Sequence, residues 1–303
     1  SGCAPLQALS DALARLVAGG SLRGQFIGQF PTTEAYAPAT LYLVDLAGDL
    51  QWYQLSEASR PGGSDQWRGP IKVGNGWNGF ARVFNGGGAA IYAIKPDGDL
   101  MWYGHDGFFE GNRTWRGPVQ VGNGWNGFQH VFPGGEYVVY GVRPDGRLLW
   151  YRHDGAPHGG DVTTWSGPRE VATGFDGYQT VMSGGDGLIY GIRPDGALIL
   201  HEHRGHANGA ADWAPAAQIG TGWQPFRAVV ACPDGVFLAF TTSGTILWYR
   251  YGDRPIQFAV VGGRRVPISL PGKRWEGPVE IRRRVPGLLQ AFASLAAPFR
   301  GPN

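Results

Sequence analysis

Short runs in which apolar and polar residues alternate recur along most of the chain. In the copy that preserves the pattern best, the alternation predicts four strands, at residues 128–132, 138–143, 148–153 and 168–171. An Asp-Gly pair separates the second strand from the third, and this dipeptide between two alternating runs is a strong signal for a β-hairpin. Each copy is therefore expected to form a four-stranded antiparallel sheet.

An eight-residue string marks the start of each copy. VGNGWNGF occupies residues 73–80 and 121–128, and it returns as VATGFDGY at 171–178 and IGTGWQPF at 219–226, with spacings of 48, 50 and 48 residues. Two other markers occur five times each. One is a hairpin glycine, at Gly48, Gly98, Gly146, Gly196 and Gly244. The other is a tryptophan ahead of the fourth strand, at Trp67, Trp115, Trp165, Trp213 and Trp275. Such a sheet unit, repeated at a period in the forties, is typical of a propeller blade.

These units predict an all-β fold, a five-bladed β-propeller of four-stranded antiparallel blades. A single unit would leave an apolar face in water, so neighbouring blades must cover one another and the ring must close. Six segments resemble the innermost strand, because both 25–30 and 288–294 look like the run that follows the eight-residue string. One of these two segments is expected to close the ring against the first or the last blade.

Two segments fall outside the repeat. Residues 6–17 have apolar residues three and four apart, which predicts a short amphipathic helix that ends at the glycines 19–20. This helix is either a cap on the propeller or part of a larger precursor. The expected organisation is therefore an N-terminal helical segment at 1–20 and a single propeller at 21–303. Residues 252–274 form an insertion in the fifth and most divergent unit.

Composition and charge exclude several classes of function. The chain has 26 basic and 24 acidic residues, a balance that argues against nucleic-acid binding. No stretch approaches the 18 apolar residues of a transmembrane segment. The two cysteines rule out a disulfide framework and a four-cysteine zinc site, and no phosphate-binding or calcium-binding loop motif is present. We therefore expect neither a cofactor nor a metal.

The GNGW strings, each followed by an aromatic residue three positions after the tryptophan, resemble the tachylectin family of five-bladed propeller lectins. The resemblance spans residues 24 to about 293. The chain departs from the family's G-x-G-G-W pattern by one glycine, by Phe175 in place of tryptophan, and by Val-Pro-Gly at 285–287. The resemblance implies N-acetylated hexosamines bound in pockets between adjacent blades, three or four of them intact. It also implies a secreted or cell-surface protein.

Sugar recognition requires an apolar face for the ring and fixed donors and acceptors for its polar groups. The repeated string offers these as tryptophans, amides and glycines with an accessible backbone. The candidate sugar-binding residues are Gly76, Trp77, Asn78, Gly124, Trp125, Asn126, Phe175, Asp176, Trp223 and Gln224. In the alternative interpretation the tryptophans pack blade against blade and the amides cap turns.

The histidines raise the question of catalysis or metal binding. His105 and His153 end equivalent strands, and His201 and His203 share one face of the fourth unit. No third ligand follows from the spacing, and no serine nucleophile accompanies a His-Asp pair, so these residues are interpreted as exposed loop histidines. No catalytic residue is predicted.

The aromatic and polar features repeat with the fold, whereas catalysis usually depends on one asymmetric constellation. The sequence therefore predicts a non-enzymatic, multivalent lectin whose partners are glycans that contain N-acetylhexosamines. Two alternatives stay open. One is an enzyme with a single site at the propeller axis or at blades four and five, with His201, Glu202, His203 and Asp253. The other is an interaction or targeting module of a larger secreted system.

Overall fold

A computed structural model describes residues 38–60, 66–253, 257–261, 264–268, 272–282, 285 and 287–294. The predicted helix at 6–17 and the candidate closing strand at 25–30 lie outside these residues, so both stay predictions.

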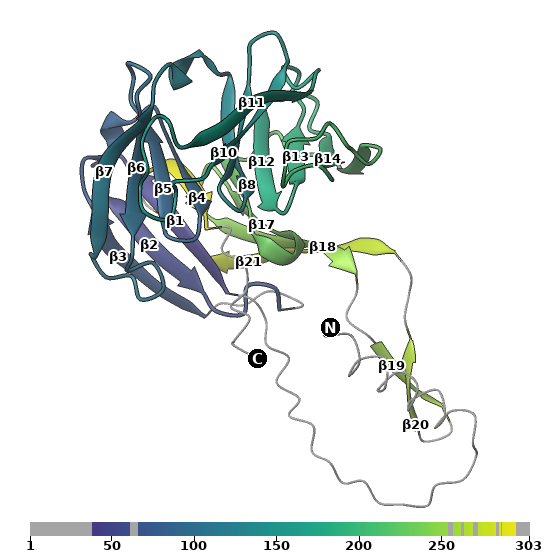
Figure 1. The fold of residues 1–303 in the computed structure, drawn as a ribbon. Helices are drawn as coiled ribbons and strands as arrows, with labels where there is room; N and C mark the ends of the chain where they lie inside the picture. The colour runs from purple at the N-terminus through teal and green to yellow at the C-terminus, as the bar shows by residue number, and fades with distance from the viewer. Residues whose placement is uncertain are drawn as a thin grey trace, which may run out of the picture. The chain divides into compact units, whose positions relative to one another are not determined.

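Five four-stranded antiparallel sheets form the blades of a propeller (Figure 1). Blade 1 contains β22 (Leu288–Ala293), β1 (Ala39–Asp45), β2 (Leu50–Leu55) and β3 (Trp67–Gly74). Blade 2 contains β4 (Arg82–Gly87), β5 (Ala90–Ile94), β6 (Leu100–His105) and β7 (Trp115–Gly122). Blade 3 contains β8 (His130–Gly135), β9 (Val138–Val142), β10 (Leu148–His153) and β11 (Trp165–Ala172). The predicted five-bladed fold is confirmed.

The last two blades follow the same order from the inner to the outer strand. Blade 4 contains β12 (Thr180–Gly185), β13 (Leu188–Ile192), β14 (Leu198–Glu202) and β15 (Ala217–Gly220). Blade 5 contains β16 (Ala228–Ala231), β17 (Val236–Phe240), β18 (Ile246–Asp253) and β21 (Lys273–Arg282). The insertion in the fifth unit contributes a hairpin of β19 (Gln257–Val261) and β20 (Arg264–Ile268).

The C-terminal strand closes the ring. β22 pairs antiparallel with β1, and Leu41 faces Ala293 while Leu43 faces Ala291. The first blade thus takes its innermost strand from the opposite end of the chain. This outcome confirms that one of the two candidate segments closes the ring, and it identifies residues 288–293 as that segment.

The hairpin glycines have the conformation that their turns require. Gly98 has φ 96° and Gly146 has φ 84°, a left-handed region that favours glycine because a Cβ would be strained there. After each of these turns the chain returns antiparallel, so that Leu148 pairs with Val142 and Leu100 with Ile94.

Both faces of each blade are buried, because a single sheet has a neighbouring blade on each side. The tryptophans of the third strands are almost fully buried and reach into the next blade. Trp52 Nε1 donates to the Phe108 carbonyl of blade 2 at 2.7 Å, and Trp150 Nε1 donates to the His206 carbonyl of blade 4 at 2.6 Å. The core is therefore distributed among the five blade interfaces.

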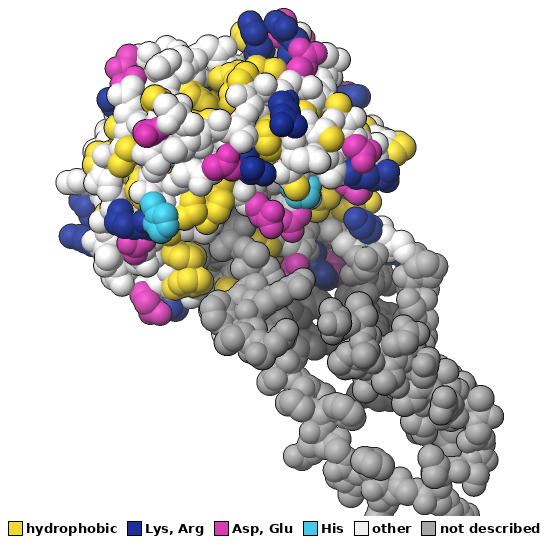
Figure 2. Space-filling view, in the orientation of Figure 1, with side chains coloured by type: hydrophobic (Ala, Val, Ile, Leu, Met, Phe, Trp, Pro, Cys, Tyr) yellow, Lys and Arg dark blue, Asp and Glu magenta, His cyan; other side chains and the backbone are white. Residues whose placement is uncertain are grey.

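Helical structure among the described residues is limited to three short 3-10 turns, η1 (Trp77–Gly79), η2 (Trp125–Gly127) and η3 (Pro233–Gly235). None of the described helices is long and apolar enough to cross a membrane. Over the visible face, basic and acidic side chains are interspersed (Figure 2). This distribution agrees with the balanced composition.

Candidate functional site

Four aromatic rings meet where blade 1 joins blade 2. Trp77 comes from η1, Phe80 follows it, and Tyr103 and Trp115 lie on β6 and β7 of blade 2. The Trp77 ring centroid lies 5.6 Å from Phe80, 4.9 Å from Tyr103 and 5.7 Å from Trp115. We call this arrangement the aromatic cluster.

The aromatic cluster recurs at the next three interfaces. Between blades 2 and 3 it consists of Trp125, Phe128, Tyr151 and Trp165. Between blades 3 and 4 it consists of Phe175, Tyr178, His201 and Trp213. Between blades 4 and 5 it consists of Trp223, Phe226, Tyr249 and Trp275. In the third cluster His201 takes the position that Tyr103 has in the first, and Tyr178 takes the position of Phe80. The Tyr178 hydroxyl and His201 Nε2 are hydrogen-bonded to each other at 2.7 Å.

The outer-strand tryptophans fasten each blade to the one before it. Trp115 Nε1 donates to the Val73 carbonyl at 2.9 Å, and Trp165 Nε1 donates to the Val121 carbonyl at 2.7 Å. Equivalent bonds join Trp213 to Val171, Trp275 to Ile219 and Trp67 to Ile281. All five interfaces therefore share one interblade link.

A pocket of about 380 Å³ opens beside the first aromatic cluster. Its lining includes Asn75, Trp77, Tyr103 and, on the rim, Lys72 and Arg113. Arg113 Nε donates to the Lys72 carbonyl at 2.8 Å, while the Lys72 ammonium pairs with an Asp49 carboxylate oxygen at 2.6 Å. The rim is thus fixed by polar contacts, and the wall is aromatic.

Trp77 Nε1 and the Tyr103 hydroxyl, on two residues that line this wall, make no hydrogen bond to a described residue. Burial raises the pKa of Tyr103, so its hydroxyl stays protonated and can donate as well as accept. The Tyr151 and Tyr249 hydroxyls hold the same repeat position, and burial likewise raises the pKa of each. The pocket therefore combines an aromatic wall with unused donors.

The structure places the four predicted aromatic residues inside the clusters. Trp77, Trp125, Phe175 and Trp223 are each at most 6% exposed. They offer a ligand a ring edge or an N–H group and no broad exposed face. Gly76 and Gly124 precede the 3-10 turns in left-handed conformation, at φ 75° and 73°, and both are exposed. Their assignment as sugar-binding residues stays a prediction.

The predicted polar residues lie over the hairpin glycines. Asn126 Nδ2 donates to the Pro96 carbonyl at 3.1 Å and covers Gly98. In the same way Asn78 covers Gly48, Asp176 covers Gly146 and Gln224 covers Gly196. All four side chains belong to exposed residues, so a turn contact and a ligand contact are compatible at these positions.

Among the residues that the structure describes, the fifth interface has no aromatic cluster of this kind. Val285 N–H donates to the Gly244 carbonyl at 3.0 Å, as Trp77 N–H donates to Gly48, so valine occupies the tryptophan position. Arg282 stands where Gly74 stands in the first pocket, and its guanidinium lies 5.0 Å from the Tyr53 ring and 5.5 Å from the Trp67 ring. Arg282 therefore fills the space that the other interfaces leave beside their aromatic residues.

The interpretation of the histidines as exposed loop residues is wrong. His105, His153 and His203 are fully buried, and each accepts or shares a hydrogen bond of 2.6 Å with a tyrosine hydroxyl of the preceding blade. Each also stacks on the outer-strand tryptophan of its own blade, with His153 4.2 Å from Trp165. Burial lowers the pKa of His153 to about 4. These rings are neutral links between blades.

No group of three or more histidine, cysteine, aspartate or glutamate side chains among the described residues is placed to hold a metal ion. His201 Nε2 is hydrogen-bonded to the Tyr178 hydroxyl. His203 forms one hydrogen bond through Nδ1, with the Tyr140 hydroxyl, and one through Nε2, with the Ala210 carbonyl. The side chain of Asp253 lies outside the described residues. The constellation suggested for blades four and five is therefore not brought together by the residues described.

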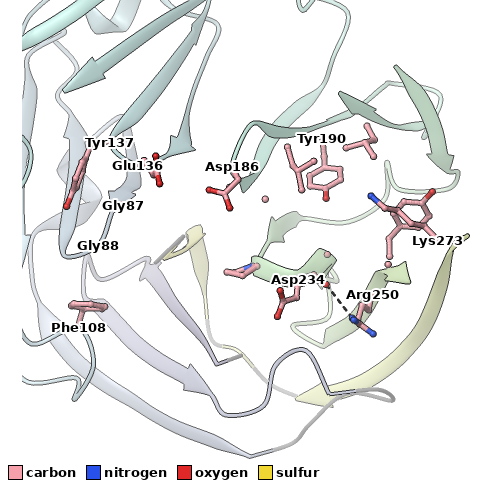
Figure 3. Close-up of a pocket in the computed structure, with 18 of the residues that line it drawn as sticks. Gly87, Gly88, Phe108, Glu136, Tyr137, Asp186, Tyr190, Asp234, Arg250 and Lys273 are labelled. Carbon is pink, nitrogen blue, oxygen red and sulfur yellow. Dashed lines mark hydrogen bonds between the residues drawn. The ribbon is translucent and has the colours of Figure 1, made fainter. Parts of the chain in front are cut away.

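Two further cavities lie on the axis. The first, of about 960 Å³, opens where the inner strands end, and Figure 3 shows Glu136, Asp186 and Asp234 around it. Arg250 and Lys273 lie toward one side of this cavity, and Arg250 Nε donates to the Asp234 carbonyl at 3.4 Å. The second, of about 340 Å³, is lined by the inner strands themselves.

Sequence reasoning missed the rim of the interblade pocket and the closed fifth interface. Arg113 lies two residues before the marker tryptophan, in the variable loop of the repeat, where no pattern singles it out. Arg282 is part of a run of basic residues and carries no motif of its own. An alignment of WRGPIKVG with WEGPVEIR would have placed it at a glycine position of the pocket.

Comparison with known proteins agrees with this geometry. A family model described as Tachylectin matches residues 43–262, well over half of the chain. No curated protein matches it. Among solved structures, the SapL1 lectin in complex with alpha methyl fucoside is 13% identical, covers 82% of this chain and 78% of its own, and has a TM-score of 0.41.

Two other solved structures are similar at the same level. A symmetrical protein described by its de novo evolutionary emergence is 18% identical over 69% of this chain and 82% of its own, with a TM-score of 0.45. AofleA from Arthrobotrys oligospora is 12% identical over 86% and 73%, with a TM-score of 0.35. At these TM-scores the likenesses carry no argument about function.

Proposed function

Because the chain belongs to the Tachylectin family, which supports a carbohydrate-binding lectin, we propose that it binds N-acetylated hexosamines at pockets between adjacent blades. The observation that supports this proposal is the pocket beside Trp77 and Tyr103, where an indole N–H and a hydroxyl make no hydrogen bond to a described residue. An acetamido group has a carbonyl for these donors and a methyl group for the aromatic wall. A non-enzymatic role at the cell surface or outside the cell is part of the same proposal.

The number of sites follows from the interfaces. Four of them carry the aromatic cluster, whereas Arg282 fills the space beside Tyr53 at the fifth. In the third cluster Phe175 and His201 replace the indole N–H and the tyrosine hydroxyl, so we propose three sites per chain. Weak sites on one rigid ring raise the effective concentration at a multivalent glycan, and avidity can exceed the affinity of one site by about 100-fold or more.

Isothermal titration with N-acetylglucosamine and N-acetylgalactosamine tests the proposal, with glucose as the ligand that lacks the acetamido group. We expect about three weak sites for at least one N-acetylated sugar and a weaker response to glucose. A single site, or equal binding of glucose, would overturn the repeat-encoded assignment. If none of the three sugars binds, the result would instead favour the interaction-module alternative.

A variant series locates the sites. Replacement of Tyr103, Tyr151 and Tyr249 by phenylalanine removes one hydroxyl from each of three pockets and leaves the rings in place. A lost hydrogen bond of this type corresponds to about 1 kcal/mol, or roughly fivefold in affinity at each altered site. Tyr53→Phe is the matched control, because it holds the same repeat position at the interface that Arg282 fills. Equal losses in the control and the test variants would contradict the location.

A further inference from the structure

The smaller axial cavity is surrounded by one strand from every blade. β22, β4, β8, β12 and β16 all contribute to its lining, and its volume is about 340 Å³. Their first residues lie at one mouth of the channel. Deeper positions are mostly apolar, with Val83, Val131 and Phe84 buried in the ring, and the buried Asn85 and Ser183 also belong to the lining. The cavity thus has a basic entrance and a mostly apolar interior.

The entrance is basic and has no acidic partner. Arg82 and Arg227 line it together with His130, and no aspartate or glutamate is part of the described lining. Arg82 donates to the Gln129 carbonyl at 3.0 Å, and Arg227 donates to the Leu288 carbonyl. Neither arginine is in an ion pair with a described carboxylate.

A half-buried guanidinium without a counter-charge is costly to the fold. Burial lowers the pKa of Arg82, and no carboxylate offsets that effect. Removal of a charge from water is unfavourable unless a partner of opposite sign compensates for it. Neither carbonyl partner carries the negative charge that would do so. An anion bound at the entrance would supply it.

The inner strands also turn a hydrogen-bonding edge toward the axis. On β4 the Val83 N–H donates to Gln290 Oε1 at 2.8 Å, a side-chain acceptor that reaches over from β22. Gln290 Nε2 in turn donates to the Phe80 carbonyl at 3.3 Å. One backbone donor of the channel is thus already paired with an oxygen atom of another strand, which shows that an acceptor fits at this depth.

The two ends of the axis differ in charge. The larger cavity, where the inner strands end, has Glu136, Asp186 and Asp234 around it together with Arg250 and Lys273 (Figure 3). The entrance with Arg82 and Arg227 has no acidic residue in its described lining, so it attracts an anionic ligand more strongly than the mixed end does. The charge distribution therefore favours one entry side for an acid.

We propose that this basic entrance and the apolar channel behind it bind an organic acid, with its anionic head group between Arg82 and Arg227 and its apolar body along the inner strands. Carboxylate and sulfate share the required chemistry, since a guanidinium donates two parallel hydrogen bonds to either group. The site is separate from the interblade pockets and does not depend on their sugar specificity.

Titration of the full chain with hexanoate, hexyl sulfate, acetate and 1-hexanol tests the proposal. One hexanoate or hexyl sulfate per chain is expected to bind at least 10-fold more tightly than acetate, which lacks the apolar body, and than hexanol, which lacks the charge. The ratio of the dissociation constants of hexanoate and hexyl sulfate distinguishes carboxylate from sulfate recognition. Excess N-acetylglucosamine should leave this binding unchanged.

Variants assign the binding to the entrance. Arg82→Gln and Arg227→Gln are each expected to weaken hexanoate binding about 10-fold or more. Arg204→Gln is the matched control, since Arg204 is exposed and pairs with Glu202 at 3.6 Å on the outer part of blade 4. If Arg82→Gln fails to fold, Val229→Phe fills the channel and should abolish binding by bulk. Absence of hexanoate binding to the unaltered chain, or binding that survives both arginine variants or the Val229→Phe variant, would overturn the proposal.

Discussion

The interface between blades 2 and 3 and the interface that closes the ring between blades 5 and 1 solve the same packing problem with different residues. At the first, Tyr92, His153 and Trp165 form a hydrogen-bonded and stacked series across the interface. At the closure, the same strand positions hold Leu238 and Leu55 in an apolar core, and Arg282 lies over the aromatic rings.

The outer-strand link is common to both interfaces. Trp165 donates to Val121 in one, and Trp67 donates to Ile281 in the other. The ring therefore closes without a tyrosine-histidine pair and without a tryptophan at the position of Val285. It follows that the link is a requirement of the fold, whereas the aromatic cluster and its pocket are additional features that the fold itself does not demand.

The largest expected effect concerns the shared link. Trp165→Ala removes a hydrogen bond and the stack on His153, and it leaves a cavity beside Trp125, so we expect a loss of about 3–5 kcal/mol in the free energy of unfolding. Trp67→Ala should cost less, because the hydrogen bond of Trp67 is longer, at 3.3 Å, and no histidine stacks on it. Urea unfolding measures both variants. Equal losses would show that the histidine stack adds nothing.

The next effect is a pH dependence that only the hydrogen-bonded interfaces have. Burial lowers the pKa of His153 from 6.5 to about 4, although Asp154 and Asp161 act in the opposite direction. A depressed histidine pKa means that protonation favours the unfolded chain. The resulting stability is fully present above pH 6.5 and is lost as the pH falls toward 4, with a magnitude on the order of 3 kcal/mol for this residue.

A double variant, Tyr92→Leu with His153→Leu, copies the closure interface into blades 2 and 3. Its free energy of unfolding should fall about 3 kcal/mol less than that of the unaltered chain between pH 6.5 and pH 4. Urea titrations at the two pH values measure the difference. The single variant Leu55→Ile, at the closure, is the control and should keep the full acid dependence. An unchanged slope in the double variant would contradict the assignment to His153.

A smaller effect is expected when the closure interface is made to resemble the others. Arg282→Gly with Val285→Trp removes the guanidinium from the rings of Tyr53 and Trp67 and restores the tryptophan of the cluster. Loss of a cation–π contact changes the free energy of unfolding by about 1 kcal/mol. If the proposed sugar sites are correct, titration should find one additional site per chain. An unchanged stoichiometry would show that the cluster alone does not make a site.

The repeat made most of the fold predictable from the sequence. The eight-residue strings, the Asp-Gly turns and the marker tryptophans set the strand order, and the predicted strand at 148–153 matches β10. The histidines were misjudged because their partners, such as Tyr92 for His153, lie on another blade about one repeat away. The choice between 25–30 and 288–294 for closure was likewise a long-range pairing, on which local propensity has no influence.

The same limit applies to the site. Sequence indicated Trp77 and Asn78 from their repetition, but repetition reflects packing as much as binding. Trp77 is compatible with both, since its ring is buried in the cluster while its N–H makes no hydrogen bond to a described residue. Asn126 illustrates the remaining alternative, because its amide donates to the Pro96 carbonyl of a hairpin turn.

The smallest expected effect separates these two roles of the amide. Asn126→Ala removes the hydrogen bond to Pro96 and the cover over Gly98, for an expected loss of about 0.5–1.5 kcal/mol in the free energy of unfolding. Asn126→Asp is the companion variant, because it keeps the shape and the cover that Asp176 supplies in the next blade, but it has no amide donor. If the amide only caps the turn, both variants keep their sugar stoichiometry. Loss of one site in both, at unchanged stability, would instead assign Asn126 to the ligand.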